Sequence, residues 1–206
     1  GFMNDWHLAT NIEGLYAAGD ALYASNCFGH AAATGYYAAR HASRYATSSV
    51  LVDFDRSQAE TEKRRIYAPL GNRPENSIGW KELNQGISKT MQNYCGEVKY
   101  ADLLKTGLQR LKEYEEDIVP KTFAYNPHEL TRLLEVFDIL TVSQIILHAS
   151  LAREASSKAL SFKRGDFPDQ EQAEHKKLII IRQIDGQIIL SEKPADFFGD
   201  LKMNYL

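Results

Sequence analysis

The chain has 206 residues, 44% of them hydrophobic, which is enough to build the core of one domain or of two small ones. Its 24 basic and 27 acidic residues give a net charge of -3, which argues against the long-range positive field that nucleic acid or anionic lipid would need. Two cysteines far apart in sequence supply neither a zinc-ligand spacing nor a disulfide framework, so a reducing, cytoplasmic location is expected.

Residues 1–52 predict a strand, a glycine-rich turn and a helix. Residues 15–18 form a short apolar run between Gly14 and Gly19, a pattern typical of a buried strand. Residues 30–45 are mostly small and include no proline, which favours a helix. Strand, turn and helix in this order are typical of one edge of an α/β nucleotide-binding domain.

Residues 53–77 are expected to be a linker between two regions of different composition. A charged run at 60–65 is followed by Pro69, Gly71 and Pro74, a mixture that favours solvated, turning backbone.

Residues 78–176 are charged and periodic, and they are expected to form a helical C-terminal domain. The pattern predicts three helices, at roughly 78–94, 99–116 and 127–160. Gly96 and Pro120 are placed to end the first two.

The third predicted helix has its large side chains at steps of three and four, so they share one stripe that should be core. The members are Leu130, Leu133, Leu134, Phe137, Leu140, Gln144, Leu147 and Leu151. Asn126 can cap this helix, Pro127 suits its first position, and the charge of Glu129 complements its dipole.

Residues 177–206 are expected to form a β-hairpin and a tail. Apolar, β-branched runs at 178–184 and 187–191 flank Asp185-Gly186, and a two-residue Asp-Gly loop is a strong hairpin signal. We expect no membrane insertion, because the apolar runs are far shorter than the roughly 20 residues of a spanning helix. The predicted fold class is α+β, mainly α.

Residues 10–20 end in Gly19-Asp20. A glycine lets backbone approach a cofactor, and a short carboxylate offers two acceptors. The segment resembles the second flavin-contacting motif of FAD-dependent oxidoreductases of the fumarate reductase and succinate dehydrogenase flavoprotein family. The resemblance implies that Asp20 accepts hydrogen bonds from the ribityl or pyrophosphate part of FAD. The alternative is a simple strand-ending turn.

Residues 26–35 are similar to the segment that leads a helix N-terminus to the flavin ring in this family. Free amides and the helix dipole stabilise the negative charge of a reduced flavin, and small residues permit close approach. The alternative is an alanine-rich packed helix without a ligand. The resemblance implies that FAD contacts Gly19, Asp20, Asn26, Phe28, Gly29, His30, Ala31, Ala32, Ala33 and Thr34.

The same segment departs from the dicarboxylate enzymes of the family. Where these enzymes have an arginine for a substrate carboxylate, this chain has Asn26 or Cys27, and neither can form a bidentate pair. Dicarboxylate specificity is therefore not expected. His30 is a candidate catalytic donor or acid/base group, and the alternative is a histidine that caps or packs at a helix start.

The helical region extends the resemblance over most of residues 1–195. The motifs are Tyr67-Ala-Pro-Leu, Trp80-Lys-Glu-Leu-Asn, Met91-Gln-Asn-Tyr-Cys-Gly, His128-Glu-Leu, Ala152-Arg-Glu-Ala-Ser-Ser and Phe162-Lys-Arg-Gly-Asp-Phe-Pro. They are closer to the adenylylsulfate reductase α-subunit subgroup. Arg153 and Arg164 are candidate catalytic, anion or redox-partner contacts, with structural ion pairs to Glu154 and Asp166 as the alternative.

The resemblance implies that the parent protein is an FAD-dependent oxidoreductase with an iron–sulfur partner. No G-x-G-x-x-G turn follows a strand here, and the family's capping domain has no counterpart. We therefore expect a C-terminal fragment that lacks its N-terminal FAD-binding partner region and is inactive alone. A function of a different class is a non-catalytic helical module that docks another subunit or forms a homo-oligomer.

Overall fold

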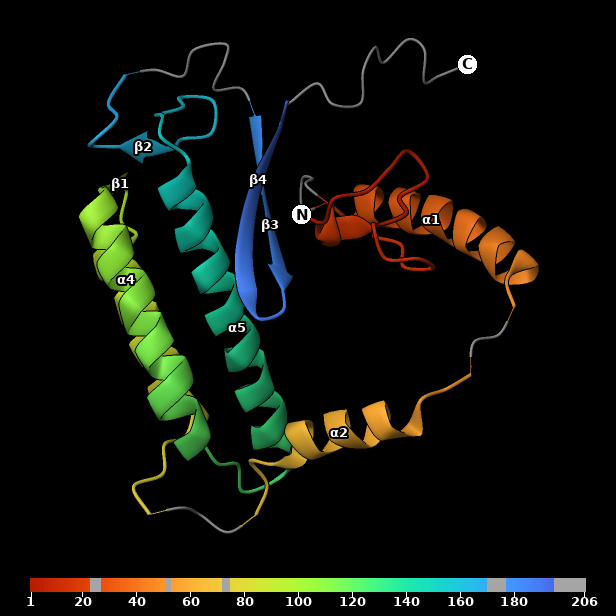
Figure 1. The fold of residues 1–206 in the computed structure, drawn as a ribbon, viewed down its shortest axis with the longest axis horizontal. Coiled ribbons are helices and arrows are strands. Elements are labelled where there is room, and N and C mark those ends of the chain that lie inside the picture. The colour runs from red at the N-terminus through yellow and green to blue at the C-terminus, as the bar shows by residue number, and fades with distance from the viewer. Residues whose placement is uncertain (23–26, 51–52, 72–74, 170–176, 195–206) are drawn as a thin grey trace. The chain divides into compact units, whose positions relative to one another are not determined.

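The computed structural model describes residues 1–22, 27–50, 53–71, 75–169 and 177–194 (Figure 1). The chain divides into two compact units, Gly1–Arg56 and Ser57–Leu206. Helices are the main elements of the described chain, and an antiparallel pair of strands lies near its C-terminal end. The prediction of a mainly α, α+β fold is confirmed. Among the described residues, none of the helices combines the length and apolarity that crossing a bilayer requires.

The first unit contains one long helix, α1 (Phe28–Ser48). It begins after Cys27, whose extended backbone and side chain cap the helix: the thiol sulfur accepts the His30 N–H at 3.3 Å. Of its described residues, only Ala38 is buried within this chain. The helix predicted at 30–45 is confirmed and is longer at both ends.

The predicted strand at residues 15–18 is wrong for the described structure. The segment makes an isolated antiparallel bridge, Ala9 with Tyr16, and the Ala17 N–H donates to Leu8 O at 2.9 Å. Ala17 is nevertheless buried, as the apolar run indicated. A strand needs neighbouring strands to pair its backbone groups, and in the described part of this unit only the preceding loop is a partner.

Helix α2 (Arg56–Tyr67) lies in the segment expected to be a linker, and all of it after Arg56 belongs to the second unit. Turning backbone was therefore a wrong prediction for residues 56–67. The run is rich in strong helix formers, and Glu62 and Arg65 form an ion pair one turn apart. None of its residues is buried, so its surface is solvated as expected.

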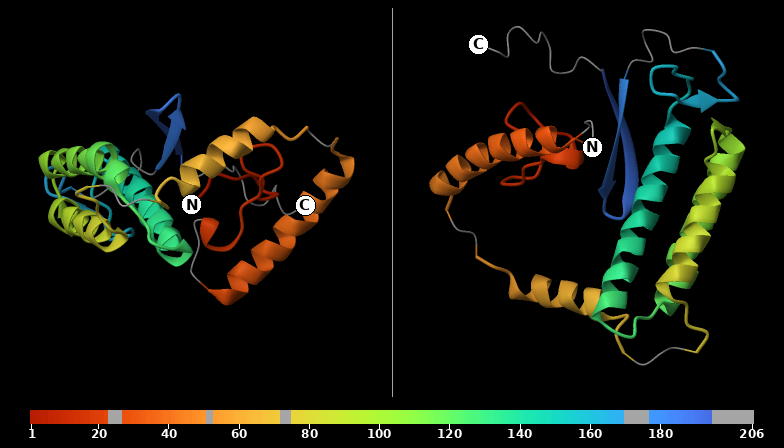
Figure 2. Two further views of the ribbon diagram at one scale, coloured as in Figure 1. Left: turned by 90° about the horizontal axis from the view of Figure 1, so that it is seen from below. Right: turned by 180° about the vertical axis from the view of Figure 1, so that it is seen from behind.

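Three helices build the core of this unit: α3 (Trp80–Tyr94), α4 (Ala101–Glu113) and α5 (Pro127–Ala152). In Figures 1 and 2, α4 and α5 run side by side along most of their length. All three helices supply buried apolar side chains to one cluster. The removal of this apolar surface from water is the main driving force for packing the unit. The cluster consists of Leu83, Ile87, Leu104, Leu111, Leu133, Val136, Leu140 and Leu147.

The start of α5 is capped as predicted. Asn126 Oδ1 accepts the Glu129 N–H at 3.0 Å, Pro127 is the first helical residue, and the Glu129 carboxylate accepts the Tyr125 N–H at 2.9 Å. The two side chains satisfy two backbone donors at this end.

The end of α5 and its apolar stripe differ from the prediction. The helix ends at Ala152, so the expected continuation to residue 160 is wrong. The buried stripe is confirmed at Leu130, Leu133, Leu140 and Leu147. Its centre also includes three residues that were not predicted, namely Val136, Ser143 and Ser150. The predicted members Leu134, Phe137, Gln144 and Leu151 are half-buried at its edge.

Beyond α4 the chain makes a wide π-helical turn, Tyr114–Ile118, and then a 3-10 turn, Val119–Lys121. Pro120 lies in this last turn and ends the helical run, as predicted. Helix α3 ends at Tyr94, two residues before Gly96.

The predicted hairpin is confirmed. Strands β3 (Lys177–Ile184) and β4 (Gln187–Pro194) are antiparallel, and Ile184 pairs with Gln187. Asp185 and Gly186 have φ of 50° and 77°, which is the geometry of a type I′ turn. A second, very short pair joins β1 (Val98–Lys99) and β2 (Lys163–Arg164) in parallel. The tail expected at 195–206 lies outside the described residues.

Candidate functional site

The Gly-Asp motif forms a short 3-10 turn, Gly19–Ala21, instead of a strand end. Gly19 has φ of +60° and is buried, whereas Asp20 is exposed. A Cβ on Gly19 would lie 3.5 Å from the Ala31 Cβ, so the turn lies close against α1. The positive φ is the reason that glycine suits this position.

A hydroxyl group ties this turn to α1. The Gly19 N–H donates to Thr34 Oγ1 at 2.9 Å, and the same hydroxyl donates to the His30 carbonyl at 2.7 Å. Thr34 therefore satisfies a buried backbone donor across fifteen residues of sequence. Asp20 and the first turns of α1 are consequently held together in one unit.

The N-terminal turns of α1 present small residues on an open surface. Gly29, Ala31, Ala32 and Ala33 are exposed, and a Cβ on Gly29 would have no heavy atom within 4 Å. Phe28 is 89% exposed, so it is available to a neighbouring group. Asn26, another predicted contact, lies outside the described residues.

His30 is half-buried, and its Nε2 atom is buried without a hydrogen-bond partner among the described residues. Burying a ring nitrogen without a partner costs free energy, so a group that bonds it would be favoured. Together with the exposed carboxylate of Asp20 and the open face of small residues, this atom fits a planar, polar cofactor with both donors and acceptors. The chemistry of these residues therefore fits a flavin.

Arg164, the second arginine singled out in the sequence, is the largest fully buried side chain in the described part of the chain. Its guanidinium makes a bidentate pair with Asp166, with both N–O distances 2.8 Å. Its Nη1 donates to the carbonyls of Ser150 and Arg153, at 2.6 and 2.8 Å, and more weakly to Leu151. Ser150 and Leu151 lie in the last turn of α5 and Arg153 follows it, so the guanidinium caps the helix where it ends.

Asp166 completes the same network on the neighbouring helix. Its Oδ2 accepts the Ala101 N–H at 2.8 Å at the start of α4, where the preceding Tyr100 provides no side-chain cap. Hydrogen bonding to the Arg164 guanidinium is the main cause that lowers the pKa of Asp166 from 3.8 to about 2. Arg164 and Asp166 therefore join the end of α5 to the start of α4.

Ser156 holds the backbone around this pair, a role that the sequence analysis did not assign. Its hydroxyl donates to Phe167 O at 2.7 Å and accepts the Arg164 N–H at 2.9 Å. Two buried serines follow α5, and a serine in a turn commonly bonds to backbone, which is the signal that could have identified it.

Arg153 follows the last residue of α5 and is half-buried. Its guanidinium lies 5.9 Å from the centre of the Phe162 ring, and burial lowers the pKa of the side chain. Arg153 and Arg164 belong to the second unit, and the Gly19, Asp20 and α1 residues belong to the first. The described part of the chain brings no three His, Cys, Asp or Glu side chains together in a metal-binding group.

Comparisons with known proteins agree on one family. The profile described as "Fumarate reductase flavoprotein C-term" matches residues 84–199. L-aspartate oxidase of Yersinia pestis is 26% identical over 183 residues, which are 82% of this chain and 31% of that protein. The fumarate reductase flavoprotein subunit of a Serratia strain is 23% identical over 175 residues, which are 77% of this chain and 29% of that protein.

Solved structures show the same fold. Adenylylsulfate reductase from Archaeoglobus fulgidus has a TM-score of 0.83 at 20% identity, over 91% of this chain and 32% of that one. A quinol fumarate reductase chain of E. coli has a TM-score of 0.77 at 18% identity, over 93% of this chain and 35% of that one. The chain thus spans about a third of the length of these relatives.

Proposed function

Because the chain belongs to the fumarate reductase flavoprotein C-terminal family, we propose that it is the C-terminal part of an FAD-dependent oxidoreductase. The parent protein transfers electrons between bound FAD, a small substrate and an iron–sulfur partner. The 206-residue chain alone is inactive, because it has no glycine-rich turn for the pyrophosphate of FAD. The flavoprotein relatives and the open surface at the start of α1 support this proposal.

The single observation that carries the proposal is the hydrogen bond from the Gly19 N–H to Thr34 Oγ1. It places an exposed carboxylate next to a helix N-terminus lined with small residues, which is a combination suited to a large polar cofactor. A simple strand-ending turn would need neither the positive φ of Gly19 nor this long-range bond.

Each residue then has a distinct role toward FAD, which supplies the redox chemistry when bound. Asp20 accepts hydrogen bonds from the ribityl or pyrophosphate part. Gly29 and residues 31–33 let the helix backbone come close to the ring. The Nε2 atom of His30 has no hydrogen-bond partner among the described residues, so it is the atom that would form a hydrogen bond with the cofactor.

The substrate is a small molecule, and the site has no specificity for dicarboxylates. Of the two residues at the position of the family's carboxylate-binding arginine, Cys27 caps α1 and accepts the His30 N–H. A thiol cannot form the bidentate pair that arginine makes. Arg153 is a candidate contact for an anion or redox partner, whereas Arg164 uses its donors inside the protein and holds the helix ends.

Flavin content of the parent protein tests the proposal. We expect the protein encoded by the complete gene to be yellow after purification and to show flavin absorbance.

D20N should weaken FAD binding roughly tenfold, since a hydrogen bond to a charged acceptor is lost. D53N, a change of another exposed aspartate in the same unit, is the matched control. A colourless parent that does not take up FAD would refute the assignment, and equal effects of the two variants would refute the role of Asp20.

A second candidate function is a docking module, because α5 has apolar side chains on its solvent side. Ile139, Val142, Ile145 and Ile146 are between 41% and 52% exposed. Such a patch commonly contacts another subunit. We expect the chain to self-associate in size-exclusion chromatography and V142E to shift it to a monomer, with T131E on the same helix as control. A wild-type chain that elutes as a monomer at high concentration would contradict self-association through this patch.

A further inference from the structure

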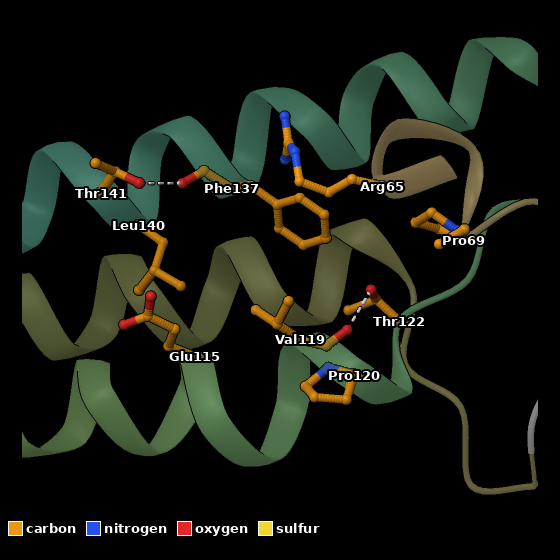
Figure 3. Close-up of a pocket in the computed structure, with 10 residues that line it drawn as sticks. Arg65, Pro69, Glu115, Val119, Pro120, Thr122, Phe137, Leu140 and Thr141 are labelled. Atoms are coloured by element: carbon orange, nitrogen blue, oxygen red, sulfur yellow. Dashed lines mark hydrogen bonds between the residues drawn. The ribbon is translucent and has the colours of Figure 1, made fainter. Parts of the chain in front are cut away.

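A cavity of about 390 Å³ lies between the end of α2, the turns after α4 and the middle of α5 (Figure 3). All of its lining residues belong to the second unit. Its volume is within the range of small-molecule sites. Phe137 and Leu140 of α5 form one wall, and Val119, Pro120 and Pro69 face them.

The hydroxyl groups at this cavity are already bonded. Thr122 Oγ1 donates to Val119 O at 2.7 Å, and Thr141 Oγ1 donates to Phe137 O at 3.1 Å. Because these donors are used inside the protein, the walls offer mainly apolar surface. An apolar group of a ligand would gain free energy here by leaving water.

Glu115 places a negative charge at one end of the cavity (Figure 3). Its Oε2 accepts the Gln144 amide N–H at 2.8 Å, which fixes the carboxylate in place. The site therefore offers a positioned, charged acceptor beside an apolar wall.

The backbone at Glu115 departs from a regular α-helix. The chain makes a π-helical turn from Tyr114 to Ile118, and such turns occur frequently at functional sites. Pro120 has no N–H. It therefore cannot donate the π-helical hydrogen bond to the Glu115 carbonyl or the α-helical one to the Glu116 carbonyl.

The positive charge on the rim of the cavity is already paired. Arg65 forms a hydrogen-bonded ion pair with Glu62, in which its Nε donates at 2.9 Å. This hydrogen bond is the main cause that raises the pKa of Arg65, and Asp138 on α5 raises it further. The charge of Arg65 is therefore offset by Glu62, and Glu115 is the acidic residue among those that line the cavity.

We propose that this cavity binds a small molecule with an apolar body and one ammonium group. The body packs on Phe137 and Leu140, and the ammonium donates to Glu115. This proposal is independent of the flavin assignment, since the cavity shares no residue with the turns around Gly19 and α1.

Three probes of similar shape and different charge test the proposal on the 206-residue chain: phenethylammonium, phenethyl alcohol and hydrocinnamate. Titration calorimetry, or amide chemical shifts of residues 115–122, measures binding. We expect the ammonium to bind roughly tenfold tighter than the alcohol and the carboxylate to bind least, since a charged hydrogen bond is gained or a repulsion is met. Equal affinities of the three probes, or no binding of the ammonium, would overturn the proposal.

Variants locate the site. E115Q should reduce ammonium binding to the level of the alcohol, and A68F should block all binding by filling the cavity from its exposed rim. E116Q is the matched control, because it removes the same charge from the same π-helical turn but does not line this cavity. If E116Q weakens binding as much as E115Q, the effect is general electrostatics and the proposed contact is wrong.

Discussion

Two groups of polar contacts hold helix ends in this protein, and they differ in what they leave open. Around Arg164, each partner of the guanidinium belongs to the protein: one carboxylate and three carbonyl groups. Around Gly19, one hydroxyl fixes the backbone, while Asp20 and the small residues of α1 remain exposed. The first group joins helix ends inside the protein, whereas the second leaves a carboxylate and small residues open to solvent. Residue type alone does not distinguish them, because both centre on charged residues next to a glycine.

The largest effect is expected from removing the Arg164 side chain. R164A leaves Asp166 and the last carbonyls of α5 without their donor, and breaking a buried pair in this way costs about 3–5 kcal/mol. Urea denaturation of the chain measures this loss. R132A breaks an exposed pair with Glu135 and should cost less than about 1 kcal/mol. Similar losses in the two variants would show that the Arg164 network contributes no more than a surface pair.

A smaller effect is expected at Thr34. T34V keeps the shape of the side chain but removes the acceptor of the Gly19 N–H, which should cost about 1 kcal/mol. Amide hydrogen exchange at Gly19 should become faster in T34V and remain slow in T34S, which retains the hydroxyl. If Gly19 exchanges at one rate in all three proteins, the bond does not hold the turn in solution, and the contrast between the two groups disappears.

A further effect is expected from acid, through Asp166. The folded pKa of this carboxyl is about 2, below its ordinary value of 3.8, so its contribution to stability is present above about pH 4. That contribution is lost as the pH falls from about 4 to about 2. Denaturation at both ends of this range, for wild type and D166N, measures it. D166N should be less stable at the upper pH and should lose less on acidification; parallel losses would assign the acid sensitivity to other groups.

Local signals in the sequence were sufficient where an element depends on adjacent residues. Asp185-Gly186 predicted the hairpin, and Asn126-Pro127 predicted the start of α5, because both structures are closed by neighbouring backbone. The end of α5 was placed too late, since the carbonyls at Ser150 and Arg153 are capped by an arginine more than ten residues further on. No local pattern reports such a contact.

The predicted site was a set of residues, and the structure adds how some of them meet. Glycine and small residues in order indicated close backbone approach, and Gly19 does lie against Ala31. The expected strand is absent from the described residues because pairing depends on partners that the run at 15–18 cannot specify. Thr34 was expected to contact the cofactor, yet its hydroxyl bonds the backbone of Gly19 and His30. Contact of these residues with FAD stays a prediction.

The Arg164–Asp166 pair also has a consequence for motion. Because one pair of side chains closes the last turn of α5 and the first turn of α4, neither turn can fray without breaking bonds that belong to the other. Helix ends ordinarily open at little cost and independently of one another. Here the C-terminal end of α5 and the N-terminal end of α4 form a single cooperative unit, so the two ends open together.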